Sequence, residues 1–294
     1  MQKPVKFTLM KSISLLAHDK HPLVAFFYEA IGAPKATIVI APAMAVSQNF
    51  YSAFARYLSL AGYHVWTFDY RGMGESLNGS MRDVQASLTD WYALDYDAVI
   101  TQAAALDRAL ALHVIGHSLG GQIAPLLPSR HLISGLVNIA VGSGAMRHNQ
   151  PSTRRLAPLL WYVIAPISCR LFGYFPGSKF GIIGDIPSAA LMQWRSWCLS
   201  PDYILSGDAS ARAAYASAEF AVLALTFADD ELLMASGSSM LHDAYTKGLV
   251  DYQLISPADV GLKRIGHFGF FKPQSEPTLW PLVTQWLDAR NMKQ

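Results

Sequence analysis

Residues 111–122 read Ala-Leu-His-Val-Ile-Gly-His-Ser-Leu-Gly-Gly-Gln. The apolar run 111–116 predicts a buried β-strand, and residues 119–127 predict a helix that Pro125 ends or kinks. Ser118 lies between them in a Gly-x-Ser-x-Gly pattern. A serine at such a strand-to-helix turn takes a tight backbone conformation that holds its hydroxyl out from the carboxyl edge of a sheet. We therefore predict that Ser118 is a nucleophile.

The helix after Ser118 favours chemistry at that serine. Its free amides and the positive end of its dipole face the turn, where they stabilise developing negative charge. We expect one oxyanion donor to be the amide of Leu119. The second is expected in the loop after the strand 36–41, with Ala43 as first choice and Met44 as the alternative. A backbone donor leaves no side-chain signature, so ordinary packing explains this apolar loop equally well.

A serine hydroxyl needs a base to remove its proton and a carboxylate to orient that base. On this kind of turn the acid and then the histidine follow later in the chain. Of nine histidines, only His267 lies on a late predicted loop. The carboxylate is expected just after the strand 221–227. We favour Asp230, keep Asp229 as the alternative, and expect Glu231 to be solvated or to start a helix.

The rest of the chain alternates short β-branched runs with longer helical patterns, which is typical of a parallel sheet covered on both faces. We expect an α/β fold with a mostly parallel, doubly wound sheet. Gly62 should end one helix and Asp90 should cap another. The expected strands are 13–16 and 23–28 as an opening hairpin, 36–41, 64–70, 111–116, 135–141, 221–227 and 251–256; the expected helices are 49–60, 90–106, 119–127, 236–245 and 278–290.

This alternation fails between residue 143 and about residue 220, a stretch rich in Trp, Pro and Gly. We interpret 143–220 as an inserted, mainly helical cap, with 1–142 and 221–294 forming the core. Aromatic walls with few charges suit an apolar acyl or aromatic group. The expected substrate-binding residues are Trp161, Trp194 and Trp197, although these rings pack a cap onto a core equally well. Arg195 either binds a carboxylate or caps a helix end.

Composition narrows the partners. The 294 residues carry 23 Lys and Arg against 21 Asp and Glu, without a basic run, so nucleic acid and an anionic membrane surface are not expected partners. Cys169 and Cys198 stand in no metal-ligand spacing, and we expect neither a metal nor an organic cofactor. The polar start of the chain has no signal-peptide pattern, which predicts a cytoplasmic protein.

One apolar stretch, 156–175, resembles a membrane segment in composition. Pro158, Pro166 and Arg170 interrupt it well short of a clean span. We expect a buried or substrate-facing pair of helices here, and no stable membrane insertion.

Several stretches together resemble landmarks of the α/β-hydrolase superfamily. They are 38–44, 68–76, 116–120, the turn at 229–230, and 266–269. The chain looks most similar to predicted bacterial hydrolases related to serine aminopeptidases and monoglyceride lipases. That resemblance implies a triad of Ser118, Asp230 and His267, and it supports a lid-like insertion before Asp230. One difference lies in the oxyanion loop, where Ala41-Pro42 replaces the usual His-Gly. Substrate contact by Arg71 is left open.

The function expected from these features is a serine hydrolase. It would cleave an ester, amide or thioester of a small, apolar acyl substrate through an acyl-enzyme on Ser118. The alternatives are an acyltransferase that uses the same triad and a catalytically inactive ligand-binding homologue. Chemistries that need an aspartate at the nucleophile turn are excluded by the serine. The acyl-chain length and the oligomeric state stay open.

Overall fold

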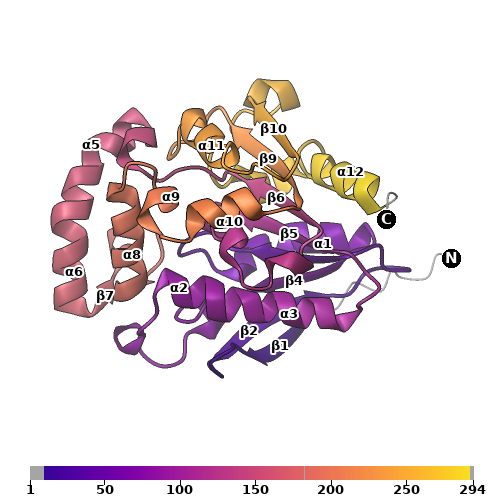
Figure 1. Cartoon of the computed structure of the whole chain (residues 1–294), viewed down its shortest axis with the longest axis horizontal. Coiled ribbons are helices and arrows are strands. Elements are labelled where there is room, and N and C mark those ends of the chain that lie inside the picture. The colour runs from indigo at the N-terminus through magenta and orange to yellow at the C-terminus, as the bar shows by residue number, and fades with distance from the viewer. Residues whose placement is uncertain (1–9, 182, 292–294) are drawn as a thin grey trace.

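The computed structural model describes residues 10–181 and 183–291 and has an eight-stranded sheet at its centre (Figure 1). The strand order is β1-β2-β4-β3-β5-β6-β9-β10. β1 and β2 form an antiparallel hairpin, β2 runs antiparallel to β4, and all the remaining pairs are parallel. The strands are β1 (Lys11–Leu16), β2 (Pro22–Tyr28), β3 (Thr37–Ala41), β4 (His64–Phe68), β5 (Leu112–His117), β6 (Gly135–Ile139), β9 (Ala221–Phe227) and β10 (Val250–Ile255). The predicted α/β class and mostly parallel sheet are confirmed.

Our expectation about the start of the chain falls largely on residues 1–9, which lie outside the described residues.

Two apolar cores lie on opposite faces of the sheet. Successive side chains of a strand point to opposite faces, so Ile38 and Ile40 of β3 enter one core while Val39 and Ala41 enter the other. One core also holds residues of α1 (Ser52–Leu60) and α12 (Trp280–Asn291). The other holds residues of α3 (Asp97–Leu106) and α11 (Ala235–His242). Burial on both faces explains why the central strands are apolar without alternation.

Two helix boundaries differ from those expected. The helix predicted to begin at Asp90 begins earlier, because Ser87 and Asp90 form a capping box. The order there is α2 (Leu88–Asp90), a π-helical segment (Trp91–Tyr96) and then α3.

The helix expected at 119–127 is shorter. α4 (Leu119–Gln122) gives way to a 3-10 turn (Ala124–Leu126) around Pro125, whose nitrogen has no hydrogen to donate. Gly62 follows the end of α1 at φ +93°, the left-handed conformation expected of a helix-ending glycine.

The segment between β6 and β9 is mainly helical. Its longest helix runs without interruption through α5 (Pro151–Leu159), a π-helical segment (Leu160–Ile164) and α6 (Ala165–Phe172). Figure 1 shows α5 and α6 at the outer edge of the molecule, with α8 on their inner side. The other elements are β7 (Tyr174–Phe175), α7 (Gly177–Phe180), β8 (Ile186–Pro187), α8 (Ser188–Leu199), α9 (Ile204–Gly207) and α10 (Ala211–Ser217).

Of the two alternatives expected for 156–175, the buried helical pair is wrong, and the substrate-facing pair stays a prediction. Only 22% of the most apolar window in Pro151–Phe172 is buried, and by length and composition this helix is long enough to cross a membrane. A narrow inner side, with Ala157, Trp161 and Ala165, packs against the protein. Leu160 and Ile164 are partly buried beside them, whereas Leu156, Leu159, Val163, Ile167 and Leu171 are exposed.

A buried histidine at the end of α11, His242, predicts that the protein loses stability in acid. His242 accepts a hydrogen bond from Asn138 at Nε2 and donates one from Nδ1 to the carbonyl of Ser238. Burial lowers the pKa of His242 from 6.5 to about 4. As the pH falls below 6.5, His242 is protonated in the unfolded chain while it stays neutral in the folded protein. The free energy of unfolding therefore falls until the pH reaches about 4, where the folded protein binds the proton too.

The native protein and His242→Gln should both lose free energy of unfolding between about pH 7 and about pH 5. We expect the loss in His242→Gln to be smaller than the native loss by about 2 kcal/mol. Glutamine keeps a neutral donor and a neutral acceptor but does not titrate. Urea denaturation of both proteins at the two pH values measures the difference. Parallel losses of stability would show that His242 does not contribute to the acid response.

Candidate active site

Ser118 stands between the last residue of β5 and the first of α4, as the sequence predicted. Its backbone has φ 48° and ψ −114°, a conformation that L residues rarely adopt. The neighbouring glycines make that turn sterically feasible, because a Cβ at Gly116 would collide with Gly121 and one at Gly120 would collide with the Ala41 carbonyl. The strained turn leaves the Ser118 side chain half-buried at the sheet edge.

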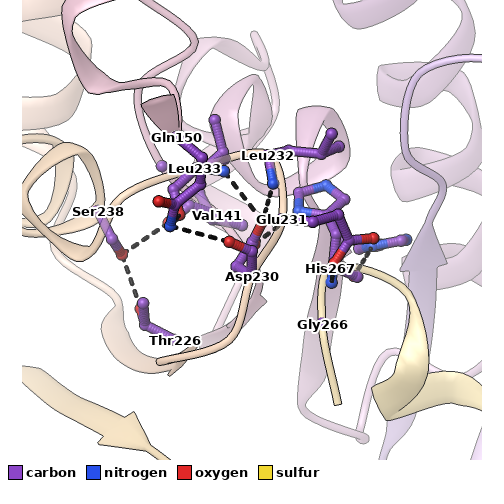
Figure 2. A network of polar contacts seen from close by, with 12 residues as sticks. Val141, Gln150, Thr226, Asp230, Glu231, Leu232, Leu233, Ser238, Gly266 and His267 are labelled. Atoms are coloured by element: carbon purple, nitrogen blue, oxygen red, sulfur yellow. Dashed lines mark hydrogen bonds and ion pairs between the residues drawn. The ribbon is translucent and has the colours of Figure 1, made fainter. Parts of the chain in front are cut away.

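Asp230 and His267 lie together in a buried pair (Figure 2). Asp230 Oδ2 is 2.7 Å from His267 Nδ1, and both side chains are less than a twentieth exposed, at 4% and 3%. A carboxylate only accepts hydrogen bonds, so Nδ1 carries the proton and Nε2 is left as the basic nitrogen. The other oxygen, Oδ1, accepts from the amides of Leu232 and Leu233. Asp230 is thereby fixed at both oxygens.

The acids on either side of Asp230 hold the backbone of the same loop. Asp229 accepts hydrogen bonds from the amides of Ile265 and Gly266, at 2.9 and 3.0 Å. Glu231 accepts one from the amide of His267, at 3.0 Å. The expectation that Glu231 starts a helix is wrong, because α11 begins at Ala235. Its side chain is 38% exposed, and its carboxylate also reaches across to the His267 loop. Three consecutive acids thus position one imidazole.

His117, the residue before Ser118, connects two loops of the site. Its Nε2 lies 3.0 Å from the carbonyl oxygen of His267, and its Nδ1 lies 2.9 Å from the hydroxyl of Tyr51. Burial holds the pKa of His117 well below its usual range, so the ring is neutral. The carbonyl can only accept, which puts the ring proton on Nε2 and makes Nδ1 the acceptor from Tyr51. The contact brings the His267 loop to the residue next to Ser118.

The chain of hydrogen bonds continues to the loop after β3. The amide of Ala43 donates to the Tyr51 hydroxyl, at 2.9 Å. This amide was the first choice for the second oxyanion donor, and we correct that choice because the group already has a partner. The amides of Met44 and Leu119 are free to donate, because neither has a hydrogen-bond partner within residues 10–181 and 183–291. Met44, the alternative, therefore replaces Ala43 as the predicted donor.

The three tryptophans predicted to bind substrate differ in their surroundings. Trp197 is fully buried, and its ring packs edge-on against Tyr203 and close to Gly207. We correct its assignment, because a ring enclosed by the protein packs the inserted segment and does not meet a ligand. Trp161 packs edge-on against Trp194, with ring centroids 5.2 Å apart, and is buried as well, so the same reason corrects its assignment. Trp194 is only partly buried and stays a prediction.

Hydrogen bonds tie the segment between β6 and β9 to α4, the helix that follows Ser118. Trp194 donates to the Tyr203 hydroxyl, which donates to the side chain of Gln122 in α4. At the other end of the insertion, Gln150 donates to the carbonyl of Asp230, at 2.9 Å (Figure 2). Sequence reasoning missed these links, since a glutamine has no pattern that predicts its partner.

The two arginines left open in the sequence have structural partners. Arg71 is buried and forms ion pairs with Asp19 and Asp95, so it is not a substrate contact. Arg195 donates to the carbonyl of Trp161 and lies over the ring of Tyr162. Trp161 lies inside the continuous helix and not at its end, so Arg195 does not cap a helix end through this bond.

Comparisons with known proteins agree with this architecture. A model of the serine aminopeptidase (S33) family of hydrolases matches residues 32–176. The chain is a member of the α/β-hydrolase superfamily. No curated protein matches this α/β-hydrolase at a significant level.

Several solved structures share the fold of this α/β-hydrolase. A soluble variant of monoglyceride lipase from Saccharomyces cerevisiae, in complex with a substrate analogue, superposes with a TM-score of 0.69, 17% identity, and 98% of this chain and 97% of that chain covered. The esterase Pf2001 from Pyrococcus furiosus gives a TM-score of 0.61, 13% identity, and 96% and 90% coverage. At such identities the likeness concerns the fold.

Proposed function

We propose that this α/β-hydrolase is a serine esterase with Ser118 as its nucleophile, His267 as its base and Asp230 as its acid. The observation that carries the proposal is the buried contact between Asp230 Oδ2 and His267 Nδ1, at 2.7 Å, on a loop that touches the residue before Ser118. The match of residues 32–176 to a hydrolase family supports a hydrolytic reaction. The lipase and esterase among the structural neighbours support an ester as the substrate.

The first half of the reaction forms an acyl-enzyme. Nε2 of His267 removes the proton of Ser118 Oγ as that oxygen attacks the ester carbonyl. The resulting oxyanion accepts hydrogen bonds from the amides of Leu119 and Met44. Collapse of this intermediate releases the alcohol, which takes its proton from His267. Asp230 keeps the imidazole in the tautomer that leaves Nε2 basic, and stabilises the imidazolium.

The second half removes the acyl group. His267 takes a proton from water, the hydroxide oxygen attacks the acyl carbonyl, and Ser118 leaves with the proton returned by His267. Ser118 Oγ has no hydrogen-bond partner among the residues that the structure describes. The bond between nucleophile and base is often long in an unliganded enzyme and tightens when substrate binds. The free hydroxyl therefore fits a resting state.

The substrate class we propose is an ester with a small, apolar acyl group. Trp194 supplies an apolar wall in the inserted segment, and fixed polar groups sit at the sheet edge. We propose 143–220 as the cap over that edge and 1–142 with 221–294 as the core. The hydrogen bonds of Gln122 and Gln150 hold the two parts together.

A series of p-nitrophenyl esters of increasing acyl length tests this function. We expect turnover by the native protein, with kcat/KM rising about fourfold for each CH2 that the apolar wall buries and falling once the acyl chain exceeds the site. Absence of turnover with every ester would contradict the proposal. Product that forms only when an alcohol or thiol acceptor is added would favour the acyltransferase.

A further inference from the structure

The outer face of the helix α5–α6 exposes a row of large apolar side chains. We define the outer stripe as Leu156, Leu159, Val163, Ile167 and Leu171, which follow one another at spacings of three or four residues and so share one face of the helix. Leu156 and Leu171, at its two ends, are 67% and 66% exposed. Figure 1 shows this helix at the rim of the molecule, with no other element outside it. Isolated exposed leucines are ordinary, but a continuous apolar row marks an interaction surface.

The charges around the outer stripe have one sign. Residues 151–184 contain no Asp or Glu. Arg154, Arg155 and Arg170 are exposed at the two ends of the helix, and Lys179 follows α6. Within the described chain, none of the three arginines has an ion pair or a side-chain hydrogen bond. The small net charge of the whole chain gave no sign that this segment carries basic residues without acidic ones.

We propose that the outer stripe binds the surface of a bilayer that contains anionic lipids. An apolar row gains free energy by entering the boundary between head groups and acyl chains, and arginines at its ends reach the lipid phosphates. The charge pattern selects a lipid surface as the partner, because arginines without an ion pair, in a segment without Asp or Glu, complement anionic head groups. This binding is independent of the proposed esterase reaction.

The helix lies along the membrane surface and does not cross it. Ala157, Trp161 and Ala165 are buried on its inner side, and the helix continues at both ends into chain that is packed on the core. A transmembrane orientation would pull these side chains out of the protein. The length of the helix, 22 residues, therefore provides a long contact in the plane of the membrane.

Sedimentation with vesicles tests the proposal. One set contains phosphatidylcholine alone, and the other contains phosphatidylcholine and phosphatidylserine in equal amounts. We expect the native protein to bind the anionic set more tightly, and the double variant Leu156→Gln/Leu171→Gln to bind it at least about tenfold more weakly. Arg155→Gln/Arg170→Gln should weaken binding to the anionic set by about fivefold per arginine and leave binding to the neutral set unchanged.

Leu249→Gln is the matched control, because Leu249 is 79% exposed and lies next to β10, away from the outer stripe. It should bind vesicles as the native protein does, and so should Ser118→Ala, which separates this test from that of the esterase. The proposal is overturned if the native protein binds neither vesicle set, or if Leu249→Gln and the double leucine variant lose binding equally. It is also overturned if the double variant changes only an oligomeric state measured by ultracentrifugation, since the occupant would then be a second copy of the chain.

Discussion

Replacing Ser118 with alanine is expected to lower kcat for ester hydrolysis by about 10⁴- to 10⁶-fold. The variant loses the atom that forms the acyl-enzyme, whereas the oxyanion amides and the apolar wall stay in place. KM should therefore change little. Steady-state hydrolysis of the best p-nitrophenyl ester measures both constants.

Stability separates this effect from misfolding. Ser118 is half-buried, and its hydroxyl has no hydrogen-bond partner among the described residues, so alanine leaves no polar group unpaired. The free energy of unfolding should stay within about 1 kcal/mol of the native value. A folded Ser118→Ala variant that retains a substantial part of the native kcat would mean that another nucleophile performs the reaction.

Asp230→Asn is expected to lower kcat by about 10⁴-fold. The asparagine can present its amide nitrogen to His267 Nδ1, which then becomes the acceptor and leaves a proton on Nε2. An imidazole in that tautomer cannot remove the proton of Ser118. The pH dependence of kcat/KM tests this reason, because loss of the carboxylate also removes the charge that stabilises the imidazolium.

Asp229→Asn is the matched control. Among the described residues, the Asp229 side chain hydrogen-bonds only to the backbone amides of Ile265 and Gly266, so the substitution loses one acceptor and leaves one amide without its partner. We expect a loss of stability of about 1–3 kcal/mol and a loss of kcat below about tenfold. Equal losses of kcat in the two asparagine variants would leave the choice of Asp230 unsupported.

The sheet and the turn at Ser118 could be predicted because their signals are local. The strand 111–116 is apolar except for His113, since both its faces are buried, and the glycines around Ser118 are needed within the same turn. The alternation of strands with helices extended that reading to most of the chain. Helix starts were less accurate, because a capping box at Ser87 competes with the simpler cap at Asp90.

Distinctions between neighbouring residues could not be predicted. Asp229, Asp230 and Glu231 are consecutive acids, and only contacts with a loop more than thirty residues later separate their roles. Ala43 and Met44 differ in the same way, because the Tyr51 hydroxyl takes the first of the two amides. Such choices depend on tertiary hydrogen bonds that leave no mark in composition or spacing.

The burial of the helix in 156–175 was predicted wrongly for another reason. A helix with apolar residues on all sides reads as buried when only periodicity is considered. Here the inner side of α5–α6 packs on the protein while the outer stripe faces solvent. The same pattern therefore fits a core helix and a helix that binds a membrane surface, and burial separates them.

The central claim is that Ser118 is a nucleophile activated by His267. Labelling with a fluorophosphonate, followed by peptide mass spectrometry, tests it most directly, because the reagent phosphonylates a serine hydroxyl only when a base activates it. We predict one label on the native protein, located on Ser118, and none on Ser118→Ala. A folded native protein that takes no label, or one whose label lies on another residue and persists in Ser118→Ala, would contradict the account.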